Sequence, residues 1–126
     1  MTPVRAIFVF TADQDLLAFP SLEDAAGYME AVDVEAAEYP AIYTDQGNVI
    51  EASAAGQTVV LTDTGRNDSG DLTFRIRRYA QMVGVPIPTD RVAFANALLR
   101  DEWEARWPQR PRWLSRRIYG ETPPSV

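Results

Sequence analysis

The chain has 126 residues and a formal net charge of −6, with 46% hydrophobic and 24% charged residues. That balance is typical of a globular domain rather than of a disordered chain. Cysteine and histidine are absent and all twelve basic residues are arginine, which excludes disulfides, thiol and Schiff-base catalysis, and a histidine general base.

The N-terminal third of the chain predicts a hairpin and then a helix. Apolar residues 4–10 and 16–19 flank a polar turn, as in two paired strands. Ser21 is a good N-cap for a helix over 21–32, and Asp24 three residues later completes an approximate capping box. The predicted buried face of this helix has helical spacing and comprises Leu22, Ala25, Ala26, Met29 and Val32.

The middle of the chain predicts a three-strand meander. Its expected strands and turns are 39–44, the turn 45–48, 49–53, the turn 54–56, and 58–62. Gly47 supplies the positive φ that a tight hairpin requires. A polar loop is expected from 63 to 70, with Ser69 or Asp71 capping the helix that follows.

The C-terminal half predicts helices separated by proline-containing linkers. A helix over 71–83 is expected to end at Gly84, and Thr89-Asp90 caps a further helix. The expected inward positions on these two helices are Leu72, Ile76, Tyr79, Ala80, Val83, Val92, Ala95, Leu99 and Trp103. A short helical tail is expected over 111–119.

Together these elements predict an α+β fold. A mostly antiparallel sheet of about five short strands, an N-terminal hairpin followed by the meander, is packed by three to four helices. We expect a single domain over residues 1–120 and a flexible C-terminal tail over 121–126. The sequence shows no signal-peptide pattern and no apolar run of membrane-spanning length, so a cytoplasmic protein is expected.

Charge is divided unevenly along the chain. Residues 1–65 carry eleven acidic residues and one arginine, a formal charge of −10, whereas residues 66–126 carry eleven arginines and seven acidic residues, a charge of +4. Two interpretations stay open: the halves face each other in the fold, or the acidic half is a docking surface for a basic partner. The net negative charge argues against nucleic acid as the main ligand.

Three patterns bear on ligand binding. Gly65 and Gly70 have phosphate-loop spacing, but Asp71 and Leu72 occupy the lysine and hydroxyl positions, which argues against a nucleotide site. The same stretch, started at Asp63, lacks the glycine and glutamate of a calcium loop. Bases and aromatics interleave at Arg75, Arg77, Arg78, Tyr79, Trp107, Arg110, Arg112, Trp113, Arg116 and Arg117. That pattern either binds nucleic acid or packs the tail onto the core, and no cofactor or metal ion is expected.

About a third of the chain, from Phe10 to Glu51, carries an ordered set of short motifs. They are Leu17-Ala18-Phe19, Ser21-Leu22-Glu23-Asp24-Ala25, Met29-Glu30-Ala31-Val32-Asp33-Val34, Glu38-Tyr39, Tyr43 and Asp45-Gln46-Gly47. This order resembles small bacterial immunity proteins of polymorphic or contact-dependent toxin systems. Such families usually have glycine before the Glu-Tyr pair, where this chain has Ala37.

The resemblance implies a cytoplasmic antitoxin that binds a cognate secreted toxin domain and occludes its active site, without catalysis of its own. An acidic protein suits a basic toxin, because complementary charge accelerates encounter. The acidic surface supplies the expected partner-binding residues, which are Asp33, Glu35, Glu38, Tyr39, Tyr43, Asp45, Asp63, Asp68 and Asp71. Two alternatives stay open: a carboxylate-dependent or metal-assisted enzyme built on the acidic cluster, and a regulatory protein whose arginine-aromatic tail binds nucleic acid.

Overall fold

The structure, a computed structural model, describes the backbone of residues 3–106 and the side chains of residues 3–101. Its helices and strands follow the order expected from the sequence. They are β1 (Ile7–Phe10), β2 (Leu16–Phe19), α1 (Leu22–Tyr28), α2 (Ala31–Glu35), β3 (Ala41–Thr44), β4 (Asn48–Ala55), β5 (Thr58–Asn67), α3 (Ser69–Val83) and α4 (Arg91–Arg106).

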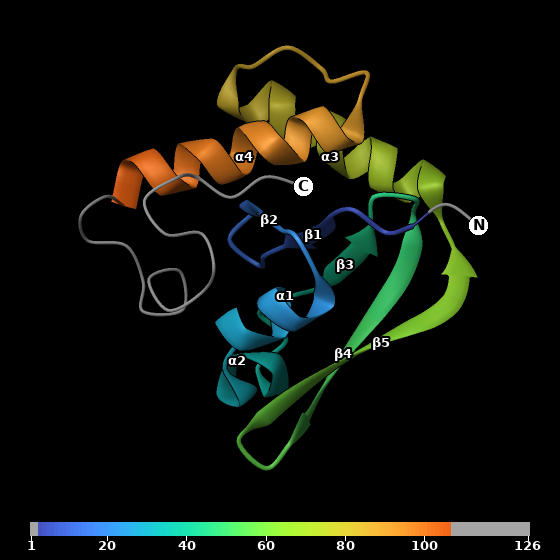
Figure 1. The fold of residues 1–126 in the computed structure, drawn as a ribbon, viewed down its shortest axis with the longest axis vertical. Helices are drawn as coiled ribbons and strands as arrows, with labels where there is room; N and C mark the ends of the chain where they lie inside the picture. Colours follow the sequence, from blue (N-terminus) through green and yellow to red (C-terminus); the bar gives the residue numbers. More distant parts are fainter. Residues whose placement is uncertain (1–2, 107–126) are drawn as a thin grey trace.

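Within the described residues, the strands form one five-stranded antiparallel sheet in the order β2-β1-β3-β4-β5. Helices α3 and α4 cover one face of the sheet, and α1 and α2 lie against the other (Figure 1). The predicted α+β fold, an N-terminal hairpin followed by a three-strand meander, is therefore confirmed.

Strand β1 supplies side chains to both halves of the core. Phe8 and Phe10 belong to the cluster beneath α3 and α4, whereas Ile7 and Val9 belong to the cluster beneath α1 and α2. Burying each such side chain contributes roughly 1.5–3 kcal/mol. Because both faces of β1 are covered, its sequence is a continuous apolar run rather than an alternation.

The sheet divides between β3 and β4. These strands pair at a single position, Tyr43 with Val49, whereas β4 and β5 pair along most of their length. The two long strands form a ribbon that extends past the rest of the sheet (Figure 1). Beyond Val49, the ribbon is held mainly by the packing of side chains such as Ile50 and Val59 in the cluster beneath α1 and α2.

The helix expected over 21–32 consists of two helices. Ser21 caps α1 as predicted: its Oγ accepts a hydrogen bond from Asp24 N at 3.1 Å and donates one to Asp24 Oδ2 at 3.0 Å. The backbone becomes extended at Met29, which ends α1. This break shifts the phase of α2, so Val32 is 64% exposed and the prediction of one continuous apolar face is wrong.

The prediction of a polar loop over 63–70 is also wrong, because β5 continues to Asn67. Polar residues suit this stretch because β5 is an edge strand with most of its side chains exposed. Helix α3 is capped by Asp68 rather than by Ser69 or Asp71, and the Asp68 carboxylate accepts from Asp71 N at 3.0 Å.

Two predicted glycine positions are confirmed. Gly47 has φ +90° in the turn between β3 and β4, and Gly84 ends α3 with φ +78°. Val83, expected to face inward, is instead 46% exposed in the last turn of α3. The predicted tail helix, the frayed end and the Trp103 side chain lie outside the described residues. None of the described helices combines the length and the apolar character needed to cross a membrane.

Candidate functional site

The structure separates the predicted partner-binding residues into three groups. One group lies on α2 and in the loop after it: Asp33, Glu35, Glu38 and Tyr39. A second group meets beneath α3 on the opposite face of the sheet: Tyr43 and Asp71. The remaining residues lie in turns, on the edge strand and at a helix cap: Asp45, Asp63 and Asp68.

Asp33, Glu38 and Tyr39 of the first group line a hollow of about 270 Å³ beside the turn between β1 and β2, whereas Glu35 is exposed on α2 and does not line it. We call it the acidic hollow; its lining residues are Thr11, Asp13, Asp15, Leu17, Tyr28, Asp33, Glu38 and Tyr39. Sequence reasoning missed Asp13 and Asp15, which lie far from α2 along the chain. The two regions meet through a hydrogen bond from Ala12 N to Glu38 O at 2.8 Å, a contact that no local pattern predicts.

An unusual backbone conformation directs the chain into the hollow. Ala37 has φ +57°, in the left-handed region that favours glycine. The following amide, Glu38 N, donates to Asp33 O at 3.0 Å and closes the turn after α2.

Three carboxylates of the hollow are available to a ligand. Asp13 is exposed, whereas Asp33 and Glu38 are half-buried, and none of the three forms a side-chain hydrogen bond or an ion pair within the described part of the chain. Asp15 differs, because its Oδ1 accepts from Leu16 N at 2.8 Å. Carboxylates grouped without internal cations create a negative potential at the surface.

Tyr39 forms part of the wall of the hollow. Burial of its ring, and then the nearby Asp33 carboxylate, raise the pKa of Tyr39 to about 12. The phenol is therefore fully protonated at neutral pH and offers a hydrogen-bond donor, not a base. The hollow thus combines negative charge with an aromatic wall.

The second group is an internal network. Tyr43 donates its hydroxyl hydrogen bond to Asp71 Oδ2, which also accepts from Arg75 Nε at 2.8 Å. The Arg75 guanidinium lies 5.8 Å from the ring centroid of Phe10. Hydrogen bonds from Tyr43 and then Arg75 lower the pKa of Asp71, whereas burial followed by the Asp71 contact raises the pKa of Tyr43 to about 12. These groups bind one another, which favours a structural role.

The third group is also occupied by internal contacts. Asp45 Oδ1 accepts from Arg5 N at 2.9 Å and from Ala6 N at 3.2 Å, which fixes the start of β1. Asp63 accepts from Gly65 N at 2.9 Å and from Asn48 Nδ2 at 3.2 Å, and Asp68 caps α3. Their carboxylates hold turns and strand ends in place.

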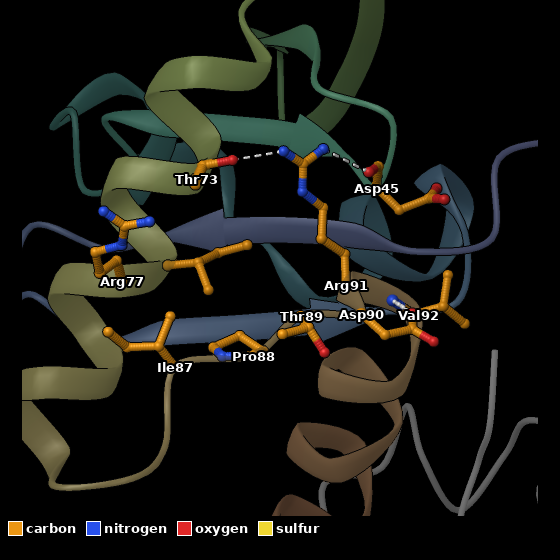
Figure 2. Close-up of a pocket in the computed structure, with 10 residues that line it drawn as sticks. Asp45, Thr73, Arg77, Ile87, Pro88, Thr89, Asp90, Arg91 and Val92 are labelled. Carbon is orange, nitrogen blue, oxygen red and sulfur yellow. Dashed lines mark hydrogen bonds between the residues drawn. The ribbon is translucent and has the colours of Figure 1, made fainter.

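A larger cavity, about 620 Å³, lies between α3 and the start of α4 (Figure 2). Arg91 reaches across it: Nη2 donates to Ser69 Oγ at 2.7 Å and to Thr73 Oγ1 at 2.7 Å, and Nη1 donates to Asp45 O at 3.1 Å. The guanidinium joins α4, α3 and the β3–β4 turn. We interpret this cavity as the space around Arg91, whose hydrogen bonds hold these three elements together, and not as a ligand site.

Within the described residues, no three acidic side chains come close enough to hold a metal ion. The tail tryptophans and arginines from residue 107 onward lie outside the described residues. Comparison with protein-family models, with curated proteins and with solved structures finds no match. The acidic hollow is the candidate functional site, because it brings the predicted residues Asp33 and Glu38 together with Asp13, and these three carboxylates have no side-chain partner within the described residues.

Proposed function

We propose that this chain is a cytoplasmic immunity protein that binds a cognate, basic, secreted bacterial toxin domain and occludes its active site. The observation that supports this function is the acidic hollow, where Asp13, Asp33 and Glu38 have no cationic partner among the described residues. A surface of this kind is suited to receive an arginine or lysine side chain from another protein.

The chemistry of the hollow fits a protein partner. Carboxylates can accept the paired N–H groups of an arginine, and the Tyr28 and Tyr39 rings provide apolar walls for its stem. Tyrosine and arginine are enriched at the centres of protein interfaces. Carboxylates around the hollow also attract a basic partner over distances comparable with the Debye length, which accelerates association.

The resemblance to immunity proteins lies over the same part of the chain. Every residue lining the hollow lies between Thr11 and Tyr39, inside the segment from Phe10 to Glu51 that carries the resemblance. The absence of histidine, cysteine and lysine supports binding over catalysis, because the side chains most used as bases and nucleophiles are missing.

The direct test is to find whether a gene beside this one encodes a large secreted protein, and to pair the chain with the C-terminal domain of that protein. Cells that produce this domain are expected to survive only with the wild-type chain present, and the two proteins are expected to co-purify. A variant carrying D13N, D33N and E38Q is expected to associate at least about tenfold more slowly at low salt. Its protection should fall accordingly.

A charge-matched comparison sets a two-site hollow variant, D33N with E38Q, against a control that neutralises two exposed acidic residues outside the hollow, E51Q with D101N. This control should protect cells and bind like the wild type. Equal loss of binding in both variants would show that net charge, not the hollow, determines the interaction. Full binding by the D13N, D33N, E38Q variant would reject the hollow as the docking site.

A further inference from the structure

Strand β5 is the last strand of the sheet, and no described residue pairs with its outer edge. An unpaired edge presents backbone N–H and C=O groups that can pair with another strand. The two halves of this edge differ in how well they are protected against such pairing.

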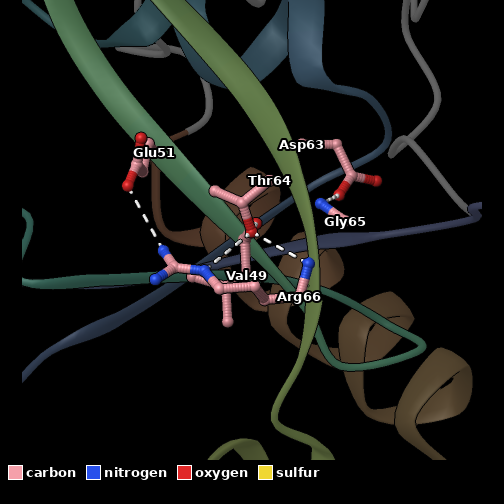
Figure 3. Close-up of polar contacts among 6 residues, drawn as sticks. All are labelled: Val49, Glu51, Asp63, Thr64, Gly65 and Arg66. Carbon is pink, nitrogen blue, oxygen red and sulfur yellow. Dashed lines mark hydrogen bonds and ion pairs between the residues drawn. The ribbon is translucent and has the colours of Figure 1, made fainter.

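The C-terminal half of β5 carries several protective features. Gly65 has φ +76°, and the pairing with β4 shifts register between Asn48 and Ile50. Asp63 and Arg66 place charges on the strand, and Arg66 Nη2 forms an ion pair with Glu51 at 3.2 Å (Figure 3). Irregular backbone and charge are the means by which natural edge strands avoid further pairing.

The N-terminal half, Thr58–Thr62, has none of these features. It contains Thr-Val-Val-Leu-Thr, without charge, glycine or proline, and it pairs with β4 in unbroken register. Its outward face is exposed, including Val60 at 43%. An uncharged, β-branched edge segment of this kind is a ready template for an additional strand.

The segment is also complementary to itself. If two copies pair antiparallel about Val60, each Thr58 lies opposite Thr62 of the second copy, and each Val59 opposite Leu61. The one charged neighbour, Asp63, lies opposite the uncharged Gln57, so like charges do not face each other in this register. Threonine–threonine pairs are favourable cross-strand partners.

Both faces of the sheet would gain contacts in this register. The two Val60 side chains contact each other on the exposed face. On the opposite face, Leu61 is half-buried in the cluster beneath α1 and α2, and Val59 of the second copy extends that cluster. We therefore propose that two copies of this chain associate through β5, antiparallel and centred on Val60, to form one continuous sheet. This interface is independent of the acidic hollow.

Cysteine cross-linking tests the register directly, because the chain contains no cysteine of its own. Directly opposed residues in an antiparallel pair have Cα atoms about 4.5–5.5 Å apart, within reach of a disulfide. The V60C variant is expected to form a covalent dimer under mild oxidation at concentrations where F74C, an exposed apolar position on α3, stays monomeric. Equal cross-linking of both variants, or none at position 60, would overturn the proposal.

Charge substitution gives a second, reversible test. Sedimentation of the wild-type protein should show a dimer that forms with increasing concentration, and V60K and V60E should each be monomeric because like charges would face each other. Mixing V60K with V60E should restore a heterodimer, while F74K should dimerise like the wild type. A wild type that is monomeric at millimolar concentration, or a V60K variant that still dimerises, would contradict the proposed interface.

Discussion

Two sets of carboxylates on this protein have the same chemistry and opposite surroundings. In the acidic hollow, the carboxylates of Asp13, Asp33 and Glu38 accept no hydrogen bond from the described residues. At the start of α3, Asp68 caps the helix, and Asp71 binds Tyr43 and Arg75. The first set is available to a partner, whereas the second set holds the fold together.

The difference lies in tertiary contacts rather than in local sequence. The sequence predicts Asp33, Glu38, Asp68 and Asp71 as parts of one binding surface and does not single out Asp13. Asp71 becomes structural because Tyr43, far away in the sequence, presents its hydroxyl to it across the core. The sequence therefore shows where carboxylates are concentrated. Which of them remain available to a partner depends on whether the fold brings an internal hydrogen-bond donor to each one.

Among single substitutions near the start of α3, we expect the largest loss of stability at Gly47, which lies in the β3–β4 turn against Ser69. A Cβ added there would lie 2.7 Å from Ser69 Cα, and the residue already has φ +90°. We expect G47A to lower the free energy of unfolding by roughly 2–4 kcal/mol, measured by urea denaturation. The control G56A has φ +65° but no atom within 4 Å, so it should cost only about 1 kcal/mol. Equal losses of unfolding free energy in G47A and G56A would show that Ser69 can move to accommodate the added Cβ.

Removal of the Asp71 carboxylate is the next largest expected effect. In D71A the Tyr43 hydroxyl and the Arg75 guanidinium lose their shared acceptor, at a cost of about 1.5–3 kcal/mol in unfolding free energy. The matched variant D33A removes a carboxylate of the hollow and should change stability by less than about 0.5 kcal/mol. Similar losses in both variants would remove the distinction between the two sets.

The hydrogen-bond network of Tyr43 and Asp71 should also make the stability of the protein depend on pH in the alkaline range. The pKa of Tyr43 rises from 10.0 to about 12 in the native protein, so between these values the native state holds a proton that the unfolded state has lost. Stability should therefore fall as pH rises from 10 to 12, and less steeply in Y43F. Because lysine and cysteine are absent, tyrosines dominate titration in this range, and tyrosinate absorbance reports it. An unchanged slope in Y43F would contradict this assignment.

The smallest effect on stability is expected in the hollow itself. Neutralising Asp13, Asp33 and Glu38 together removes repulsion between grouped carboxylates and breaks no described hydrogen bond. The unfolding free energy should stay within about 0.5 kcal/mol of the wild type, with any small gain disappearing at high salt. A large loss would indicate that these carboxylates support the fold.

Much of the fold could be predicted from local sequence, because its signals are local. The Ser21 cap, the positive φ of Gly47 and the stop at Gly84 depend on neighbouring residues, and all three predictions are confirmed. The break at Met29 and the extension of β5 could not be predicted, because packing and an edge position determine them. Asp13 joined the site only through the contact between the β1–β2 turn and the loop after α2.

The single backbone pair between Tyr43 and Val49 has a consequence for local opening of the native state. Strands β1, β2 and β3 share a complete ladder, but the β4–β5 ribbon joins them mainly through side chains. Loss of packing around Ile50 and Val59 would therefore release the ribbon while the other strands stay paired. Amide protons of the ribbon should exchange with solvent well before those of β1, as two separate cooperative units.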